Sequence, residues 1–472
     1  MNRKTKIVCT IGPASDSREK LSQLIDLGMN VARLNFSHGS HEEHGRRIKL
    51  IQELRDEKNK PVSVLLDTKG PEIRLGLFEN GSAQLQTGAR FTLTTRDVTG
   101  NCEIAHITYS RLPEDISVGT RILLDDGLMA LNVDEIDGTD IHCTVLNGGT
   151  ILNRKGVNVP GIHLSMPFIS ERDRADILFG IKQNVDYIAA SFSRSAEDVM
   201  QIRKLLDENG GESIMIIAKI ENSEGVENID EILNVSDGVM VARGDMGVEI
   251  PLEDVPILQK MIIKKALVKG KHTITATQML DSMTKNPRPT RAEATDVANA
   301  IYDGTSAIML SGETAAGNYP LEAVETMARI AVRTEESINY QSRFSRFRVA
   351  DKMNVTEAIS HATCTVAHDL NAKTIITVTR SGQTARMISR FRPHIPIVSC
   401  TTEAKVYQQL SLAWGVTPLR CEHCSTTEKL FDHAVEVALT NGCVDKGDVA
   451  VLTGGAPIGV PGTTNLLRVY AV

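Results

Sequence analysis

The 472-residue sequence lacks several features that define specialised classes of protein. It has no apolar run near the ~20 residues that a membrane-spanning helix needs, and the apolar stretch near its start is too short for a secretory signal. It also has no Gly-x-x-x-x-Gly-Lys-Ser/Thr motif, which excludes a P-loop nucleotide site. We therefore expect a protein without membrane contact that works in the cytoplasm.

A dense set of cysteines and an excess of basic residues are also missing. The eight cysteines are scattered rather than grouped into a disulfide framework, which favours a reducing compartment. The 52 basic and 59 acidic residues give a net charge of −7, which argues against a nucleic-acid partner. The length predicts two to four domains.

The first seventy residues alternate between short apolar runs and amphipathic stretches. Strands are predicted at 6–9, 29–34 and 61–66, and helices at 17–27 and 41–58. This order predicts a parallel sheet. From about residue 70 to 164 no long helix is predicted, and short alternating runs are separated by turn dipeptides, which indicates a small inserted β domain.

Alternation of helices and strands resumes at Ser170. Five further strands are predicted to end near Ala190, Lys219, Ala242, Ala276 and Leu310. The helices that follow them are predicted at 196–208, 226–233, 254–268, 291–302 and 321–339. Three strands before the insertion and five after it make a (β/α)8 barrel.

A basic stretch at 340–351 is predicted to be a linker, and a smaller alternating unit follows it. Helices are predicted at 355–370, 385–391 and 426–441, and strands at 374–378, 395–399, 449–452 and 466–469. The expected fold class is α/β. It consists of a TIM barrel at 1–69 and 170–342, an inserted small β-barrel lid domain at 70–169, and a C-terminal open-sheet α/β domain at 343–472.

Six of the predicted barrel strands end in polar residues, at the edge where barrel enzymes carry their active sites. The singled-out groups are Arg33, Asn35, Ser37, Asp67, Thr68, Lys69, Lys219, Glu221, Arg243, Asp245, Thr277, Gln278, Ser311 and Glu313. Any one strand end is explained as well by the start of an ordinary loop. Six polar ends at one rim favour a functional site.

The residue types at this rim indicate a reaction. Glu221 and Asp245 lie on adjacent predicted strands and suit one Mg²⁺ ion, which typically takes one or two carboxylates plus substrate oxygens. The cations Arg33, Arg74, Arg243 and Lys219 suit a phosphate-bearing substrate. A metal and cations around a phosphate predict phosphoryl transfer.

At these residues the sequence closely resembles the pyruvate kinases. The segments that carry the resemblance are 5–13, 30–39, 66–74, 218–222, 241–249, 276–283 and 309–315. The resemblance implies a barrel with a β lid and a regulatory C-terminal domain. It also implies transfer of the phosphoryl group of phosphoenolpyruvate to ADP in the last step of glycolysis. Mg²⁺ (with Mn²⁺ as a substitute), K⁺, a phosphorylated effector and a homotetramer are expected with it.

The resemblance also implies roles for particular residues. Lys219 would stabilise the enolate and the transferring phosphoryl group, Thr277 would help to protonate the enolate, and Glu221 with Asp245 would bind Mg²⁺. Arg33 and Arg74 would contact phosphates, with Asn35 and Arg74 on the nucleotide side. The backbone of Arg243, Gly244 and Asp245 would hold the substrate carboxylate. The K⁺ ligands would be Asn35, Ser37, Asp67 and Thr68, and Glu72 marks members of the family that need K⁺, although it could instead pair with Arg74 or Lys69.

One loop of the C-terminal unit is a candidate effector site. It follows a predicted strand and opens a helix, and it consists of Thr379, Arg380, Ser381, Gly382, Gln383 and Thr384. An ordinary strand-to-helix turn explains it too. In relatives regulated by fructose bisphosphate this loop binds phosphate, and several carry a basic residue where this chain has Gln383. The loop at 454–465 resembles the other wall of that site.

Other interpretations remain open. One is a different Mg²⁺-dependent barrel enzyme that handles phosphoenolpyruvate or pyruvate, such as a lyase or an aldolase, which would need neither an ADP site nor a lid of this kind. The other is a non-catalytic sugar-phosphate sensor, which predicts losses among Lys219, Glu221, Asp245 and Thr277, and none of these is lost. Cys421 and Cys424 have metal-like spacing but no second Cys/His pair. His41 and His44 are expected on a solvated helix face, Asp125-Asp126-Gly127 in a hairpin turn, and Cys9 in the core.

Overall fold

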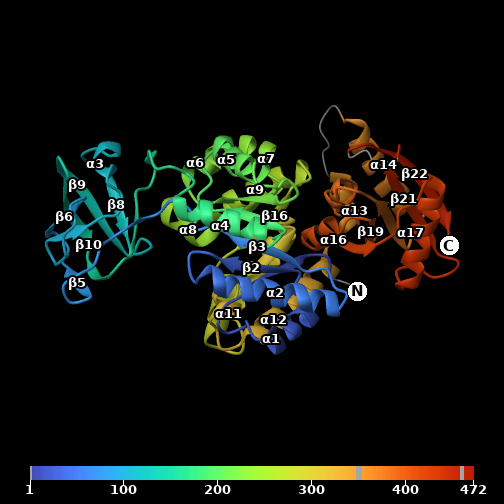
Figure 1. Ribbon diagram of the computed structural model, residues 1–472, viewed down its shortest axis with the longest axis horizontal. Coiled ribbons are helices and arrows are strands. Elements are labelled where there is room, and N and C mark those ends of the chain that lie inside the picture. The colour runs from blue at the N-terminus through green and yellow to red at the C-terminus, as the bar shows by residue number, and fades with distance from the viewer. Residues whose placement is uncertain (1–2, 347–352, 458–461) are drawn as a thin grey trace.

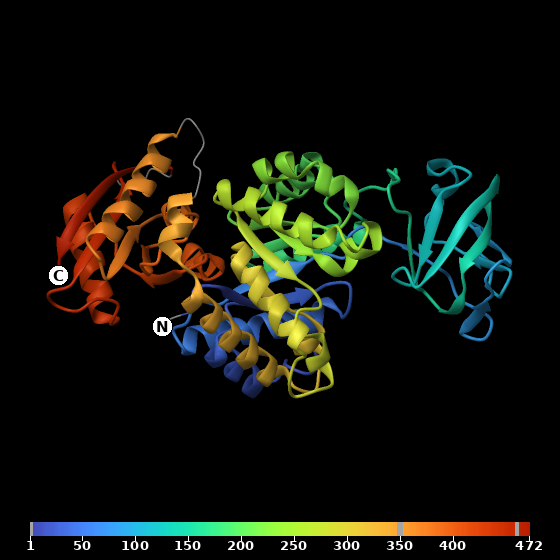
Figure 2. The same ribbon diagram turned by 180° about the vertical axis from the view of Figure 1, so that it is seen from behind.

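The computed structural model describes residues 3–346, 353–457 and 462–472. The chain forms three bodies in a row, with a β body at one end, a barrel in the middle and a smaller α/β body at the other end (Figure 1). The view from behind shows the same order (Figure 2). None of the described helices combines the length and the apolar character required to span a lipid bilayer.

The central body is a closed barrel of eight parallel strands, which confirms the expected fold class. Its strands are β1 (Lys6–Thr10), β2 (Val31–Asn35), β3 (Ser63–Asp67), β13 (Tyr187–Ala190), β14 (Met215–Ile220), β15 (Gly238–Ala242), β16 (His272–Ala276) and β17 (Ala307–Leu310). They close in the order β1-β17-β16-β15-β14-β13-β3-β2. The strands are apolar and almost wholly buried, as expected where helices cover the outside and side chains fill the inside.

The long helices lie around the barrel. They are α1 (Arg18–Leu27), α2 (His41–Glu57), α4 (Glu171–Lys182), α5 (Ala196–Asp207), α9 (Val255–Val268), α10 (Arg291–Asp303) and α12 (Pro320–Ser337). Side chains of Ser17, Ser40, Ser170, Ser195 and Thr290 cap the starts of five of them. Such caps satisfy backbone N–H groups that have no partner inside the helix.

Short helices account for most differences from the sequence-based expectation. The single helix expected at 226–233 is two, α6 (Ser223–Glu227) and α7 (Ile229–Val235). α8 (Arg243–Glu249), the 3₁₀ turn η1 (Asp281–Thr284) and α11 (Gly312–Ala315) follow strands β15, β16 and β17 and were not expected. Segments of four to seven residues are too short to show a helical period, so only tertiary contacts define them.

The lid follows β3 and has its own hydrophobic core. Its strands are β4 (Ile73–Arg74), β5 (Ser82–Leu85), β6 (Arg90–Thr94), β7 (Ile104–His106), β8 (Arg121–Leu124), β9 (Met129–Asp137), β10 (Asp140–Asn147), β11 (Gly149–Leu152) and β12 (Gly156–Asn158), with one helical turn, α3 (Leu112–Asp115). Seven of them form a sheet in the order β4-β12-β8-β9-β10-β6-β7, and β11 pairs with β5. An isolated bridge between Leu75 and Ile107 connects the two edges of the sheet.

The C-terminal body is an open five-stranded sheet in the order β20-β19-β18-β21-β22. Its strands are β18 (Thr374–Val378), β19 (Ile397–Thr401), β20 (Val416–Arg420), β21 (Val449–Gly455) and β22 (Thr464–Ala471). Its helices are α14 (Val355–Asp369), α15 (Gln383–Ser389), α16 (Ala404–Gln409), the 3₁₀ turn η2 (Leu410–Leu412) and α17 (Thr427–Thr440). β22 is antiparallel to its neighbour, so the sheet is mixed.

The expected linker is partly helical. Residues Tyr340–Arg346 form α13, and the remaining positions of the expected linker, 347–351, lie outside the described residues. Tyr340 is buried, with Trp414 and His394 beside its ring and the Lys4 ammonium 4.3 Å from the ring centroid. The helix could not be predicted from the sequence, because the segment is basic and a single buried aromatic residue gives no periodic pattern.

The C-terminal body covers the amino ends of the barrel strands. Leu412 is fully buried among interior side chains of the barrel that include Val8 and Leu65. Ser63 at the start of β3 donates its hydroxyl hydrogen bond to the carbonyl of Gln408 at 2.7 Å, and Tyr187 donates to the carbonyl of Gln409 at 2.6 Å. The two bodies therefore share a buried and partly polar interface at the face opposite the lid.

Candidate active site

The carboxyl ends of the barrel strands face the lid across a large cavity. The cavity has a volume of about 640 Å³. Residues that line it from the lid side include Glu72, Arg74, Asp126 and Lys155, and residues from the barrel side include Phe192, Asn222, Asp245 and Glu249. A concave space of this size at this end of a barrel is the usual position of an active site.

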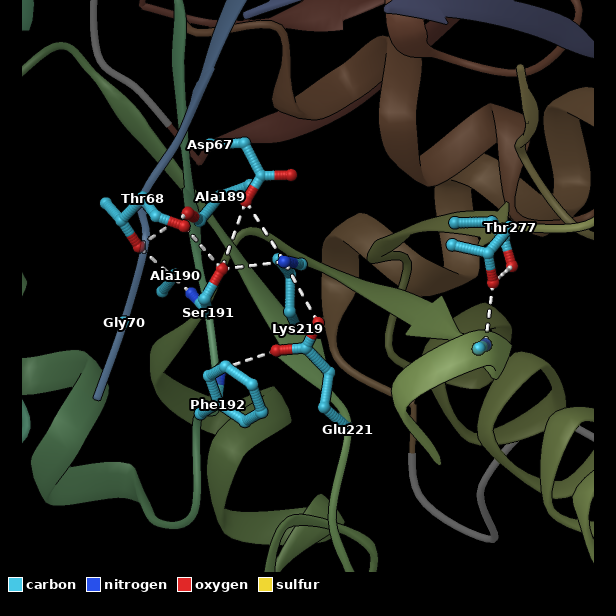
Figure 3. Close-up of polar contacts among 12 residues, drawn as sticks. Asp67, Thr68, Gly70, Ala189, Ala190, Ser191, Phe192, Lys219, Glu221 and Thr277 are labelled. Atoms are coloured by element: carbon cyan, nitrogen blue, oxygen red, sulfur yellow. Dashed lines mark hydrogen bonds and ion pairs between the residues drawn. The ribbon is translucent and has the colours of Figure 1, made fainter. Parts of the chain in front are cut away.

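Lys219 lies at the centre of a buried ion network beside this cavity (Figure 3). Its Nζ lies 3.1 Å from Asp67 Oδ1 and 2.9 Å from Glu221 Oε1. The side chain of Asp67 is 0% exposed and that of Glu221 is 1% exposed, so both carboxylates depend on protein partners for charge compensation. Arg33 completes the network, because its Nε donates to Asp67 Oδ2 at 2.6 Å.

Ser191 connects the parts of this network and was missed by the sequence analysis. Its Oγ accepts from Lys219 Nζ at 2.6 Å and donates to the carbonyl of Thr68 at 2.7 Å or to Asp67 Oδ1 at 3.1 Å (Figure 3). It directly follows β13, whose end was not among the six polar strand ends. The same strand-end rule would have found it.

The charges in the network determine the pKa values of its members. Burial opposes ionisation of Asp67, but Arg33 and Lys219 outweigh burial and lower its pKa. Burial would also neutralise Lys219, but Asp67 and Glu221 outweigh it and raise the lysine pKa. Burial raises the pKa of Glu221, with Lys219 opposing and Asp245 adding to the rise. A carboxylate in that position is stabilised by a further cation, which suits a divalent metal.

The backbone around Glu221 is constrained. Glu221 Oε2 accepts from the backbone N–H of Phe192 at 2.6 Å. Phe192 has a φ of 54°, a left-handed conformation that costs energy for a bulky residue. This hydrogen bond fixes one carboxylate oxygen and leaves Oε1 toward Lys219. Asp245, the second expected magnesium ligand, lies in the first turn of α8 and lines the cavity.

Thr277 lies next to the start of α8. Its Oγ1 accepts from the backbone N–H of Gly244 at 2.7 Å and donates to the carbonyl of Ala276 at 2.7 Å (Figure 3). Thr277 has a φ of 70° and Gln278 one of 52°, so the backbone at the end of β16 is left-handed at two successive residues. Such strain persists only where the surroundings hold it, and it commonly marks a functional site.

The side chain of Arg243 is held by an ion pair at the end of the barrel. Its guanidinium forms a bidentate ion pair with Asp296, at 2.6 and 2.7 Å, and donates to the carbonyl of Thr277 at 2.8 Å. Asp296 on α10 therefore balances the charge of Arg243, and a contact of this charge with a substrate phosphate stays a prediction. In the structure Arg243 holds α8 against the end of β16.

The expected potassium ligands come from two adjacent strand ends. Asn35 and Asp67 are register partners of β2 and β3, and Ser37 and Thr68 follow them. Asn35 Oδ1 accepts from the N–H of Ser37 at 3.1 Å. Carboxylate, amide, hydroxyl and carbonyl oxygens suit a hard monovalent cation, so the donor set fits the ion.

Glu72 lies where the chain leaves the barrel for the lid. Its carboxylate pairs with Lys69 at 3.1 Å and with Arg74 at 2.5 Å, so both of the alternative partners are present. Arg74 also donates to the carbonyl of Arg154 at 2.8 Å. Asp173, which the sequence analysis missed, accepts from the N–H groups of Lys69 and Gly70 at 3.0 and 3.1 Å. These contacts fix the connection to the lid.

The candidate effector loop borders a second cavity of about 250 Å³. Four loop residues line it: Thr379, Arg380, Ser381 and Thr384. Gln383 is not among the lining residues. Gly382 is the N-cap residue directly before α15 and has a φ of 77°. Thr464 faces Thr384 across a hydrogen bond of 2.7 Å between their hydroxyls. Part of the opposite wall, residues 458–461, lies outside the described residues.

Several other sequence signals have structural explanations. His44 is buried and stacks on Phe36 with ring centroids 4.0 Å apart, so its placement on a solvated face was wrong: this side of α2 faces the core. Cys9 is buried, as expected. Asp125 and Asp126 have φ values of 51° and 54° and lie in the turn between β8 and β9, which confirms the hairpin. Within the described ranges no group of three or more His, Cys, Asp or Glu residues is placed to hold a metal ion.

Comparisons with known proteins agree with the geometry over nearly the whole chain. The family model "Pyruvate kinase, barrel domain" matches residues 2–324, and "Pyruvate kinase, alpha/beta domain" matches residues 357–470. Proteins named pyruvate kinase from Geobacillus stearothermophilus and Clostridium acetobutylicum are 54% and 51% identical to this chain, over all of it and over 81% and 100% of their own lengths. A crystal structure of a pyruvate kinase from Cryptosporidium parvum superposes with a TM-score of 0.94 at 43% identity, over 99% of this chain and 96% of that one.

The position of Ser191 leads to a first prediction. Ser191→Ala removes the hydroxyl that joins Lys219 to the Thr68 carbonyl, so Lys219 should lose its fixed position. We expect turnover in an assay of ATP formation from phosphoenolpyruvate and ADP to fall roughly 10- to 100-fold, the scale for a misplaced catalytic group.

The neighbouring Ser193→Ala is the matched control. Ser193 is also buried, but its hydroxyl donates to the carbonyl of Ala190 and makes no contact with Lys219. Its turnover should stay close to that of the unmodified chain. Equal losses in the two variants, or a Ser191 variant with full turnover and an unchanged melting temperature, would contradict a positioning role.

Proposed function

The chain belongs to the pyruvate kinase family and is a phosphotransferase, and from this premise we propose how its residues transfer the phosphoryl group of phosphoenolpyruvate to ADP. The products are pyruvate and ATP, in the last step of glycolysis. The observation that carries the assignment of residues is the buried network around Lys219, which lies at the strand ends beside the cavity. A lyase, an aldolase or a non-catalytic sensor is not supported by the comparisons.

We assign Glu221 and Asp245 as the protein ligands of Mg²⁺, with Mn²⁺ as a substitute. Glu221 is buried, its pKa is raised by burial, and Asp245 adds to that rise. A divalent cation there supplies positive charge to the oxygens of the transferring phosphoryl group. Substrate oxygens would complete its coordination, since two carboxylates are typical of Mg²⁺ sites in phosphoryl transfer.

Lys219 is proposed as the main catalytic cation. As the bond between the enol oxygen and phosphorus breaks, negative charge develops on that oxygen, and the ammonium group stabilises it. Asp67, Glu221 and Ser191 hold the ammonium in place before substrate binds, so little reorganisation is needed. Arg33, fixed by Asp67, and Arg74, at the lid connection, are assigned to phosphate contacts, with Asn35 beside the nucleotide.

The remaining step is delivery of a proton to the enolate carbon. Thr277 is proposed to position the group or water that supplies this proton, because its hydroxyl lies between the N–H of Gly244 and the carbonyl of Ala276. The backbone of residues 243–245 is assigned to the substrate carboxylate. Gly244 suits this role, since a Cβ there would lie 3.3 Å from Thr277 Oγ1 and crowd the approach.

Other assignments complete the proposal. The domains are taken as 1–69 with 170–342, 70–169 and 343–472. We propose a homotetramer in the cytoplasm, with phosphoenolpyruvate and ADP as substrates and neither nucleic acid nor membrane as partners. The effector is proposed to be a phosphorylated metabolite that binds at residues 379–384, beside the cavity of about 250 Å³ in the C-terminal body.

The role of Lys219 has a direct test. Lys219→Met keeps the length of the side chain but removes its charge, so turnover in the coupled assay for ATP should fall by roughly 10²–10³ or more. The variant must remain folded, which circular dichroism and the melting temperature establish. Near-normal turnover in a folded variant would remove Lys219 from the mechanism.

The magnesium assignment predicts a change in metal dependence. Asp245→Asn replaces a charged ligand by a neutral one, so the Mg²⁺ concentration needed for half-maximal activity should rise along with a fall in turnover. Glu249→Gln is the matched control, because Glu249 lines the same cavity but bonds to Asn158 in the lid. An unchanged Mg²⁺ requirement in Asp245→Asn would show that this carboxylate does not bind the metal.

Potassium dependence follows from the charge balance of the site. Negative charge is crowded into one region by the substrate phosphates and by the carboxylates of Asp67, Glu72, Glu221 and Asp245. A monovalent cation bound by Asn35, Ser37, Asp67 and Thr68 would offset part of this charge. We expect strong activation by K⁺ over Na⁺ at constant ionic strength, and less dependence in Glu72→Lys, which carries its own positive charge. Full activity of the unmodified chain in buffer with neither K⁺ nor Na⁺ would contradict the proposal.

The effector proposal is tested by calorimetric titration with sugar phosphates and phosphorylated nucleosides. Binding should be linked to substrate affinity by a coupling free energy of about 1–3 kcal/mol. Thr384→Asp places a carboxylate at the cavity and should abolish binding while leaving the barrel intact. If no phosphorylated metabolite binds, or if binding survives in this variant, the site is elsewhere.

A further inference from the structure

A small cavity between the barrel and the C-terminal body has an unusual lining. Its volume is about 10 Å³, close to that of a single water-sized sphere. It lies where the α9–β16 connection, with Lys271, and the start of β16, with His272, meet α15 and the turn after it. Four cationic side chains line it: Lys271, Arg386, Arg390 and Arg392. Among the described residues no aspartate or glutamate lines it.

Lys271 and Arg390 are bonded to groups outside the cavity lining. Lys271 donates to the carbonyl of Ser236 at 2.6 Å, and Arg390 pairs with Glu357 at 2.8 Å. Asp237 is the acidic group that opposes the lowering of the pKa of both Lys271 and Arg386. Its carboxylate accepts from the N–H of Ile216 at 2.9 Å, and Asp237 is not among the residues that line the cavity. The acidic groups therefore balance the periphery of the cluster rather than the cavity itself.

Arg392 and Arg386 contribute the remaining donors. Arg392 is 4% exposed. Its Nη1 donates to the carbonyl and hydroxyl of Ser389 at 2.7 and 3.2 Å, and its Nη2 donates to the carbonyl of Gly304 and the hydroxyl of Ser306 at 3.0 and 3.1 Å. Its Nε is buried and makes no hydrogen bond with any part of the chain that the structure describes. Arg386 donates from one terminal nitrogen to the carbonyl of Ser381 at 3.1 Å. A guanidinium has five N–H donors, so the Nε–H of Arg392 and further donors of Arg386 remain for a ligand.

The pKa of His272 is affected by the positive charge around the cavity. Its side chain is buried at the cavity, and burial first, then Arg386, Arg392 and Lys271, lower its pKa to about 3. The imidazole is therefore neutral at physiological pH and adds no charge of its own. The positive charge of Arg392 is costly, because its side chain is buried and no acidic group of the cavity lining balances it.

From this lining we propose that the cavity binds one small anion, of the size of chloride, between Arg386 and Arg392. A cation is excluded by repulsion. Chloride is larger than a water molecule and would need a slight widening of the cavity, whereas a phosphate or a carboxylate would need several times its volume. A water molecule would fit, but it would leave the positive charge unbalanced. The anion would join α15, which carries Arg386, to the connection between α10 and β17, where Arg392 reaches Gly304 and Ser306.

Bromide replaces chloride and can be located by its anomalous scattering. Crystals of the full chain soaked in sodium bromide should show an anomalous peak in this cavity, within hydrogen-bond reach of Arg386 and Arg392. A peak absent from the cavity, or bromide at exposed surface residues only, would overturn the proposal and leave a water molecule as the occupant.

Stability in solution gives an independent measurement. At constant ionic strength, exchanging gluconate for chloride should raise the melting temperature by about 2–5 °C in a saturable manner, since a ligand of the folded state stabilises it. Arg386→Met should lose this response. The control Arg468→Met removes a half-exposed arginine of the same body, 3.8 Å from Asp432, and should keep it. Equal responses in the two variants, or no chloride response in the unmodified chain, would contradict the assignment.

Discussion

The active-site end of the barrel depends on one buried ammonium group. Lys219 lies between the carboxylates of Asp67 and Glu221. The side chain of Asp67 is 0% exposed and that of Glu221 is 1% exposed. Buried charges of this kind are tolerated only with partners at short distance. Asp67 belongs to β3, Ser191 follows β13, Lys219 belongs to β14 and Glu221 follows it. The network therefore exists only when these strands are adjacent and in register.

The rest of the site is arranged around that network. Left-handed residues at the ends of β13 and β16 direct the N–H of Phe192 to Glu221 and the hydroxyl of Thr277 to Gly244. The Arg243–Asp296 ion pair fixes α8, and with it the Asp245 carboxylate, at the edge of the cavity. These positions are held by polar contacts that the apolar barrel core could not supply. They explain why so many charged groups can remain in place before a substrate arrives.

The lid and the C-terminal body meet the barrel in different ways. The lid has its own core and contacts the barrel through polar pairs, such as Asn158 with Glu249 and His163 with Glu224. The C-terminal body inserts Leu412 into the barrel interior and buries arginines at its boundary. An interface of the first kind suits a cover over a cavity, and one of the second kind suits a rigid joint. The cationic cavity at Arg386 and Arg392 lies in that joint.

The sequence by itself determined the eight barrel strands, the inserted β body and the strand ends that carry Lys219, Glu221, Asp245 and Thr277, because strand and helix periods and barrel geometry are local or general properties. Tertiary structure alone decided which of these groups meet. It paired Arg243 with Asp296, and it placed Ser191 beside Lys219 in the network. It also buried His44 and turned part of the expected linker into α13. These outcomes depend on partners that are distant in the chain, such as Ser191 with Lys219, 28 residues apart, and Arg243 with Asp296, 53 residues apart. No local pattern encodes the proximity of such partners. A short helix is likewise stable only when distant residues pack against it.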